Sequence, residues 1–344
     1  MNNYHYALIA TPCFVLIVHM EVFMIKHILV PLDNSTLAEC VLQHVIAIAP
    51  VTNARITLSH VMEHPHNGDG TPAVDPVDWH LRKHKAEQYL EQIAEQLRKS
   101  GLSVEHTILE GNPAESIIEF ARNNNVDLIA LSTHGLSGLS GWNVSSVVHK
   151  ILMRSYKSTL LVRAYQSTAA GSSGVHYKRL FIGLDCSPRA EYILPVAMNL
   201  ARFHNSQLIL GTVIQKPQTV HRFPHSEENG KLINQIVEKN RQAASHYFDQ
   251  LHIQFSQKGL ELRTNIAIGD NAIAILHDMV EEANADLVML VAHGHSGERR
   301  WPYGSVTTSF IAYGNTPLMI MQDLSDDEIQ QTHAELAVRE GWGH

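Results

Sequence analysis

Two acidic residues, Asp33 and Asp185, each stand at the end of a short apolar run and directly before a helical pattern. A carboxylate in that position can accept hydrogen bonds from a sugar hydroxyl or from the amino group of adenine. It can equally cap the helix that follows, because Asp and Ser are common capping residues. The residue types alone therefore leave two roles open for these carboxylates, ligand binding and helix capping.

Segments of small residues follow two later apolar runs, one from Ser132 to Ser146 and one from Val291 to Ser305. Backbone N–H groups can bind phosphate where such a segment enters a helix, since no side chain holds the anion away and the helix dipole favours it. Neither segment is a Walker loop or a GxGxxG fingerprint. A phosphate-binding loop and an ordinary glycine-rich turn fit the spacing about equally well.

Histidine is abundant, with 23 residues, but its spacing gives little support for a metal site. His80 and His84 are four positions apart on a predicted helix, and His64 and His66 stand in the loop before it. Exposed helix histidines without an accompanying cluster of carboxylate and histidine are usually solvated, so we expect no metal. No Ser, His and Asp order and no paired carboxylates stand out, so we expect no catalytic residues.

The composition narrows the class of protein. The 344 residues are 44% hydrophobic and 17% charged, as in a globular chain of about two domains. Lys and Arg number 26 against 34 Asp and Glu, and the net charge of -8 argues against nucleic acid as a partner. The three cysteines, Cys13, Cys40 and Cys186, are too scattered for a disulfide framework, which fits the reducing cytoplasm.

Residues 1–24 are predicted to be a leader outside the fold. The apolar run Ala7–Val18 is shorter than the roughly 20 residues that a spanning helix needs, so we expect no membrane segment. A secretory signal requires Lys or Arg before its apolar run, and none is present here. Met24 stands directly before the first predicted strand, which favours a start codon assigned too early. An interfacial anchor and an extra strand are the alternatives.

The remaining chain contains an internal repeat. Ile28–Asp33 matches Leu180–Asp185, an offset of 152 residues (185 minus 33), and the second strands follow at the same offset. At Gly111–Ala114, which matches Gly269–Ala272, the offset is 158 residues (269 minus 111). Apolar residues recur at helical spacing after each of these strands and loops. Both copies therefore have the same order of elements.

Each copy alternates short apolar strands with amphipathic helices, which predicts right-handed βαβ crossovers. Continuous apolar runs such as Asp127–Leu131 and Asp286–Leu290 are typical of parallel strands that are covered on both faces. A long helix is predicted from about Trp79 to Ser100, and its counterpart passes through Tyr247 to about Lys258 after a loop at 216–230. The sequence thus predicts an α/β protein with two tandem doubly wound parallel-sheet domains.

The predicted domains are 25–165 and 177–323, joined by a linker at 166–176. The linker contains the small, polar stretch Gln166–Gly174, which is flexible by composition and long enough to join adjacent domains. A tail at 324–344 follows. It opens with Ser325–Glu328, a capping-box pattern that predicts a short helix.

These motifs resemble the universal stress protein family, in duplicate. Nucleotide-binding members carry the motif G-x2-G-x9-G-[ST], which aligns with Ser132, Gly135, Ser145 and Ser146 and again with Val291, Gly294, Gly304 and Ser305. The family also has an acidic residue after its first strand and a base-contacting residue after its second. The resemblance covers about 25–165 and 177–323, and it implies an adenine nucleotide alpha hydrolase-like, Rossmann-like fold.

The resemblance implies a site for ATP, with or without Mg²⁺, at the strand ends and the loop of each copy. The first comprises Pro31, Leu32, Asp33, Val61, Leu131, Ser132, Gly135, Ser145, Ser146 and Val147, and the second Gly183, Leu184, Asp185, Val213, Leu290, Val291, Gly294, Gly304, Ser305 and Val306. Ser132 and Ser145 replace motif glycines, which a phosphate loop tolerates unless a position needs a positive φ. Val291 also replaces a glycine, and we expect its branched side chain to narrow the ligand's approach.

The function that the resemblance implies is that of a cytoplasmic tandem stress protein, which binds ATP or a related adenine nucleotide in stress response or signalling, with slow hydrolysis at most. The alternative is an interaction module that binds no nucleotide and docks an unknown protein partner. A ligase or transferase is a third reading, but no second constellation for a substrate is present. Family members pair single domains through their last strands. We expect the two copies to pair in this way within one chain, and a homodimer of the whole chain stays open.

Overall fold

A computed structural model describes residues 24–63, 75–135, 144–164, 174–217, 227–294 and 302–324. The predicted leader up to residue 23, most of the predicted linker and the predicted helix after Ser325 lie outside these residues. Among the described residues, no helix has both the length and the apolar character needed to cross a membrane.

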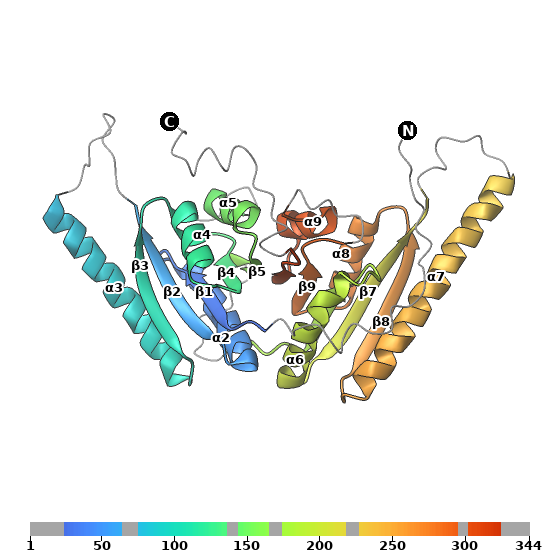
Figure 1. The fold of residues 1–344 in the computed structure, drawn as a ribbon, viewed down its shortest axis with the longest axis horizontal. Coiled ribbons are helices and arrows are strands. Elements are labelled where there is room, and N and C mark those ends of the chain that lie inside the picture. The colour runs from blue at the N-terminus through green and yellow to red at the C-terminus, as the bar shows by residue number, and fades with distance from the viewer. Residues whose placement is uncertain are drawn as a thin grey trace.

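One ten-stranded sheet runs through the described residues in the order β3-β2-β1-β4-β5-β10-β9-β6-β7-β8 (Figure 1). The first half contributes β1 (His27–Pro31), β2 (Arg55–Met62), β3 (Val104–Glu110), β4 (Leu128–Ser132) and β5 (Ser158–Val162). The second contributes β6 (Arg179–Gly183), β7 (Gln207–Gln215), β8 (Leu262–Gly269), β9 (Leu287–Val291) and β10 (Leu318–Met321). All strand pairs within a half are parallel, which confirms the predicted fold class.

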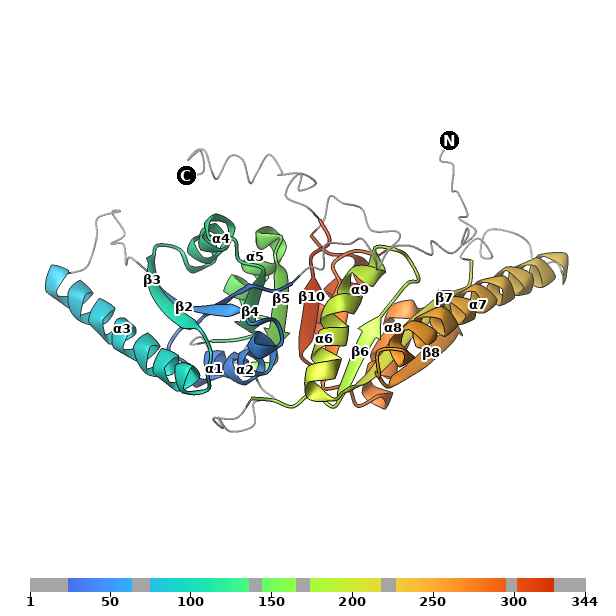
Figure 2. The same cartoon turned by 60° about the horizontal axis from the view of Figure 1, so that its bottom comes forward.

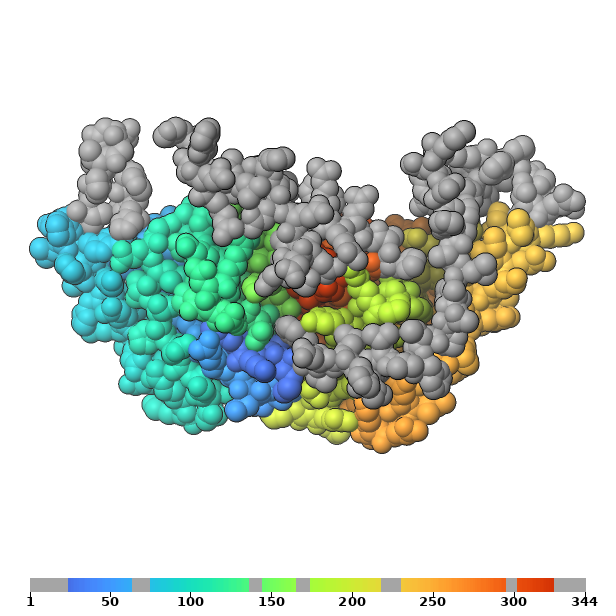
Figure 3. All heavy atoms as spheres, viewed as in Figure 1, coloured from blue at the N-terminus to red at the C-terminus, as the bar shows by residue number. Residues whose placement is uncertain are grey.

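Helices cover both faces of this sheet. One face carries α1 (Thr36–Glu39), α2 (Val41–Thr52) and α3 (Pro76–Lys99), and in the second half η3 (Ala190–Ile193), α6 (Leu194–His204) and α7 (Glu227–Ser256). The other face carries α4 (Pro113–Asn123), α5 (Ser146–Ser155), α8 (Ala272–Glu282) and α9 (Ser305–Tyr313). The long helices α3 and α7 lie at opposite ends of the molecule (Figure 1), where Figure 3 shows cyan atoms at one end and yellow atoms at the other.

Buried apolar side chains fill both layers between sheet and helices. Along β1, Ile28 and Val30 point into one layer and Leu29 into the other, and all three are 0% exposed. Alternate side chains of a strand point to opposite faces, so a strand covered on both sides must be apolar throughout. Each such side chain contributes about 1.5–3 kcal/mol by its removal from water.

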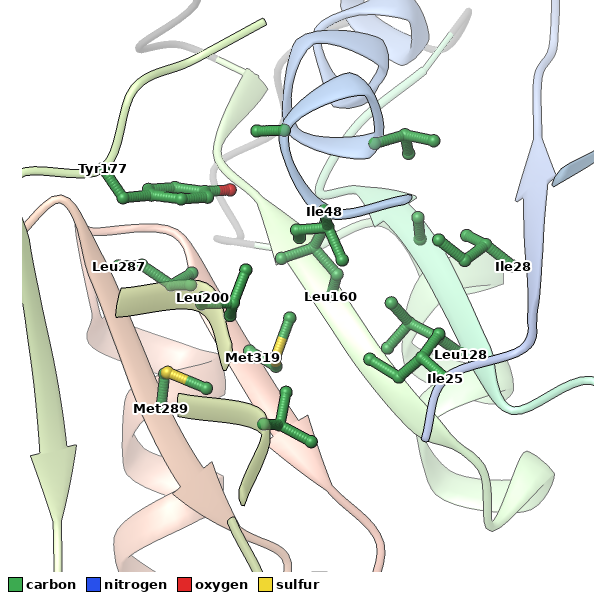
Figure 4. Packing of buried hydrophobic residues seen from close by; sticks show 14 of the residues in the cluster. Ile25, Ile28, Ile48, Leu128, Leu160, Tyr177, Leu200, Leu287, Met289 and Met319 are labelled. Carbon is green, nitrogen blue, oxygen red and sulfur yellow. The ribbon is translucent and has the colours of Figure 1, made fainter. Parts of the chain in front are cut away.

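The two halves meet at β5 and β10, which pair antiparallel with Leu160 opposite Met319 (Figure 2). Helices of both halves cover this junction, and Ile48 of α2 and Leu200 of α6 lie near it in the same core layer (Figure 4). The expected pairing of the two copies through their last strands is therefore present within one chain.

The first helix of each half is interrupted, although the sequence predicts one continuous amphipathic helix. In the first half the N–H of Cys40 bonds to the oxygen of Ala38, and this tight turn separates α1 from α2. In the second half a 3-10 turn, η3, precedes α6. Pro195 stands in the first turn of α6, where its missing N–H costs no helical hydrogen bond.

The long helices begin earlier than predicted. Helix α3 begins at Pro76, because Asp75 caps it through a 2.9 Å hydrogen bond from the N–H of Val77 and proline suits the first helical position. Helix α7 begins at Glu227, inside the stretch for which the sequence predicts a loop. The edge strands β3 and β8 were not predicted, since their largely half-exposed residues lack a continuous apolar run.

Candidate functional site

A cavity of about 660 Å³ lies in the first half, at the carboxyl ends of β1, β2 and β4 and beside α3, α4 and α5. Strands β1 and β4 are neighbours, and the sheet continues from them in opposite directions, to β2 and to β5. Doubly wound folds bind ligands at such a switch point, since the diverging connections leave a crevice. All ten first-half residues predicted from the sequence line this cavity: Pro31, Leu32, Asp33, Val61, Leu131, Ser132, Gly135, Ser145, Ser146 and Val147.

Asp33 is held at the end of β1 by a tight turn. Its Oδ1 accepts hydrogen bonds from the backbone N–H of Ser35 at 3.2 Å and from Ser35 Oγ at 2.6 Å. Ser35 Oγ also accepts the N–H of Ala38 at 3.0 Å and so caps α1. Asn34 between them has a φ of 65°, a left-handed conformation that Asn tolerates. Ser35 is thus the helix cap, and Asp33 instead lines the cavity.

Gly135 lies directly against Asp33. A Cβ atom on Gly135 would clash with Oδ2 of the Asp33 carboxylate. Glycine is therefore required here by the close approach of two segments that are about a hundred residues apart in the chain. This approach brings the strand-end carboxylate and the loop after β4 to one place.

Ser145 and Ser146 place the N-terminus of α5 at the cavity. Ser145 caps the helix, because its Oγ accepts the N–H of Val148 at 3.3 Å. Its φ is -67°, so serine fits this motif position without strain. Gly304, the counterpart in the second half, has a φ of -72°, and a Cβ there would have ordinary contacts only. The first N–H groups of such a helix have no partner within the helix and can bind an anion.

Ser132, the other serine in place of a motif glycine, ties the loop after β4 to α1. Its Oγ lies 2.7 Å from the carbonyl oxygen of Leu37 and 2.8 Å from that of His134. Cys40 Sγ donates to the same hydroxyl at 3.4 Å. Burial raises the pKa of the Cys40 thiol, which keeps the donor protonated. The substitution therefore adds a structural contact between the loop and the helix.

One wall of the cavity is apolar. It consists of Val61 of β2, Leu131 of β4, Ile117 of α4, and Val148 and Ile151 of α5. Ligand sites are typically lined by apolar side chains with a few polar groups that fix the ligand's orientation. A flat aromatic base would bury well against this wall.

Some residues of the cavity were not predicted from the sequence. His60 of β2 lies against β1, with its Nδ1 2.9 Å from the carbonyl oxygen of Leu32. Glu63 follows β2, and Arg82 and Lys85 of α3 bring two positive charges to the cavity. None of these residues belongs to a motif. Helical spacing is the one feature of the sequence that points to Arg82. This residue lies one turn before the first apolar residue on the buried side of the predicted helix.

The second half repeats the arrangement at the end of its first strand. Asp185 Oδ1 accepts the N–H of Ser187 at 3.0 Å, and Ser187 Oγ accepts the N–H of Ala190 at 3.2 Å. Cys186 has a φ of 60°, close to that of its counterpart in the first half. A Cβ on Gly294 would stand 2.5 Å from Asp185 Oδ2. The close approach of acid and loop is therefore present in both halves.

The other second-half residues predicted from the sequence lie at the same edge of the sheet. Gly183, Leu184, Val213, Leu290 and Val291 are at or just after strand ends, and Gly304, Ser305 and Val306 form the start of α9. Val291, which was expected to narrow the ligand's approach, is 7% exposed and packs within the core layer on the η3 and α6 face.

A buried ionic network adjoins the second-half loop. Asp323, with a side chain only 3% exposed, lies with Oδ2 2.8 Å from Arg189 Nε and with Oδ1 2.8 Å from His293 Nδ1. The backbone N–H of His293 also donates to Oδ1 at 3.2 Å. In the first half Leu37 takes the place of Arg189 (189 minus 152), so this network is particular to the second half.

No group of three or more His, Cys, Asp or Glu that could hold a metal ion occurs in the part of the chain that the structure describes. His84 lies 2.9 Å from Gln88 on the same helix, and His64 and His66 lie outside the described residues. Cys186 is a free thiol, and burial raises its pKa to about 11.

Comparisons of the sequence and of the structure with known proteins point to the same family. A family model described as the universal stress protein family matches residues 24–163 and 176–322. Universal stress protein MJ0531 of Methanocaldococcus jannaschii is 27% identical over 139 residues, which is 40% of this chain and 82% of that protein. Universal stress protein MJ0577 of the same organism is 27% identical over 159 residues, which is 42% of this chain and 98% of that protein.

Solved structures share the fold over both halves. A universal stress protein from Archaeoglobus fulgidus aligns with a TM-score of 0.63 at 18% identity, covering 88% of this chain and 100% of that one. A putative universal stress protein from Pseudomonas aeruginosa aligns with a TM-score of 0.61 at 17% identity, covering 89% and 95%. Because the family model matches each half in turn, the chain belongs to the universal stress protein family as a tandem member.

Proposed function

We propose that this chain binds ATP or a related adenine nucleotide in the first-half cavity and acts in the cytoplasm in stress response or signalling. The observation that carries the proposal is that ten residues predicted from three separate motifs line one cavity of about 660 Å³. The motifs are far apart in the sequence, and folding brings them to the switch point of a doubly wound sheet.

Each part of the cavity suits one part of a nucleotide. The base would lie against the apolar wall that includes Val61 and Leu131. Asp33 would accept a hydrogen bond from a ribose hydroxyl or from the adenine amino group. The phosphates, with or without Mg²⁺, would lie at Gly135 and at the N-terminus of α5 beside Ser145 and Ser146, where the helix dipole favours anions.

Binding, with slow hydrolysis at most, is the proposed activity. Two carboxylates, Asp33 and Glu63, line the cavity; Asp33 would bind the nucleoside, and no motif gives Glu63 a catalytic role. The second half repeats the acid and loop arrangement at Asp185 and Gly294, so we propose a second site there. We further propose that the halves 25–165 and 177–323 act as two domains joined by their shared sheet.

Isothermal titration calorimetry with ATP and Mg²⁺, on protein freed of carried-over nucleotide, tests this proposal. Ser146→Ala should weaken binding by about ten- to hundredfold, because it removes one hydrogen bond to a charged oxygen. Ser100→Ala, at the far end of α3, is the matched control and should leave the affinity unchanged. Absence of both heat and thermal shift at millimolar ATP would favour the alternative, an interaction module that binds no nucleotide.

A further inference from the structure

Helix α3 carries two cations to the first-half cavity. Arg82 and Lys85 both line it, and both side chains are exposed. Ala86, which follows Lys85 and stands one turn after Arg82, is buried, with 3% of its surface exposed. The first turns of α3 thus extend past the buried contact and present Arg82 and Lys85 at the mouth of the cavity.

Neither cation forms an ion pair with the described residues. Arg82 lies with its guanidinium carbon 5.9 Å from the centre of the Trp79 ring on its own helix. Lys83, between them in sequence, is bonded instead to Glu110 at 3.1 Å. Arg82 and Lys85 are therefore available to an anion in the cavity, and Lys83 is not.

Residues that are alike in both halves identify the positions of α7 that are equivalent to those of α3. In the first half Tyr89 of α3 donates a hydrogen bond to Glu39 at 2.8 Å. In the second half burial and the charge of Glu191 raise the pKa of Tyr247. Tyr89 and Tyr247 are 158 residues apart (247 minus 89), and the buried Ala86 has its counterpart in Ala244 at the same offset. These pairs fix the register of α3 against α7.

In this register Asn240 corresponds to Arg82 and Ala243 to Lys85. Both second-half residues are neutral. In the second half, Val237 of α7 packs with Ile214 of β7 and with Ala244 in a small apolar cluster. In the first half the charged side chains of Arg82 and Lys85 line the cavity.

We infer that the first-half cavity selects adenine nucleotides by their phosphate charge, with Arg82 and Lys85 as the selecting residues, and that the second half lacks this selectivity. The inference rests on the proposed function, because it concerns ligands of the same site. The acids Asp33 and Glu63 also line the cavity and without the two cations would repel a polyphosphate. Hydrogen bonds between cations and phosphate oxygens are shorter and stronger than neutral ones.

Calorimetry on the full chain with ATP, ADP, AMP and adenosine tests the inference. The wild-type chain should bind ATP at least tenfold more tightly than adenosine at its higher-affinity site. Arg82→Asn with Lys85→Ala installs the second-half residues. The double variant should lose at least tenfold in ATP affinity and stay within twofold for adenosine. Lys83→Gln is the matched control on the same helix and should bind all four ligands as the wild type does.

Two further results separate this inference from the proposed function. The ATP affinity of the wild type should fall more steeply with salt than that of the double variant, because exposed charges are screened. The reciprocal change, Asn240→Arg with Ala243→Lys, should raise the ATP affinity of the second half. An unchanged ratio of ATP to adenosine affinity in the Arg82 and Lys85 double variant would overturn the inference alone. Failure of the wild type to bind any of the four ligands would overturn the proposed function as well.

Discussion

The guanidinium of Arg163, in the first half, donates a 2.6 Å hydrogen bond to the carbonyl oxygen of Phe310, in the second. It donates a second, at 3.1 Å, to the carbonyl oxygen of Ile311. Both acceptors belong to the last turns of α9, where the helix dipole favours a cation. Arg163 is 1% exposed, so a fully buried charge joins the two halves beside the pairing of β5 with β10.

Arg163→Met should weaken this contact and lower the stability of the whole chain. Two hydrogen bonds from a charged donor are lost, and we expect a cost of about 3 kcal/mol. For a chain of this size that is a fall of roughly 4 °C in the thermal midpoint. Arg98→Met is the control, since Arg98 is exposed and pairs with Glu91 at the surface. Equal midpoints for the two variants would show that the buried contact contributes nothing.

Acid should destabilise the chain through His44, which lies between the halves with Nδ1 2.7 Å from the hydroxyl of Tyr177. Burial lowers the pKa of His44 to about 4, from an ordinary value of 6.5. Between pH 6.5 and 4, His44 is therefore protonated in the unfolded chain but stays neutral in the folded chain. Stability should be unaffected by this group above pH 6.5 and should fall by about 3 kcal/mol toward pH 4.

Urea unfolding of His44→Gln between pH 4 and 7.5 measures this effect. Glutamine can still bond to Tyr177 but does not titrate, so the variant should lose less stability on acidification than the wild type does. His84→Gln, on the exposed face of α3, is the control and should follow the wild type. Parallel curves for all three proteins would exclude His44 as the source of acid sensitivity.

Gly135→Ala should disturb the first-half site, because the new methyl group would clash with the Asp33 carboxylate. We expect a loss of stability and of ATP affinity together. Gly230→Ala, in α7, is the control, since no other part of the described chain lies within 4 Å of an added Cβ there. Removing the carboxylate as well, in Asp33→Ala with Gly135→Ala, should restore stability without restoring affinity. An additive double-mutant cycle would contradict the proposed contact between the two residues.

Asp323→Asn should loosen the second-half loop by removing the charge that Arg189 and His293 share. Asp323 is buried but the Arg189 side chain is 25% exposed, so the cation left behind is partly solvated, and we expect a loss of about 1–2 kcal/mol in thermal or urea unfolding. Glu238→Gln, which breaks an exposed pair with Arg241 on α7, should have little effect. A melting curve like the wild type's would show that the network is not needed for the fold.

The repeat and its strand ends were predictable from the sequence, because buried parallel strands need continuous apolar runs and the duplication reveals them twice. The edge strands β3 and β8 escaped prediction, since their exposed positions interrupt that pattern. The start of α7 escaped for a similar reason: residues 227–230 include a glycine and resemble a loop. Burial patterns thus define the centre of the sheet better than its margins.

The candidate site was predictable only where it consists of local motifs. The Asp33 turn and the small-residue loop are adjacent in sequence to the strands that position them. Arg82 and Lys85 are brought to the same cavity by the long helix α3, and no spacing rule links them to Asp33. Whether Arg82 and Lys85 reach the cavity depends on how far α3 extends past the sheet, and this is a property of the tertiary packing.

The antiparallel junction of β5 and β10 gives the two halves opposite orientations within one sheet. The carboxyl ends of β1 and β4 therefore open at one edge of the central sheet, and those of β6 and β9 open at the other. A single small ligand bound at one edge has no contact with the other. Ligands in the two proposed sites would therefore not touch, and any coupling between them would have to pass through β4, β5, β10 and β9, the strands that lie between the two sites.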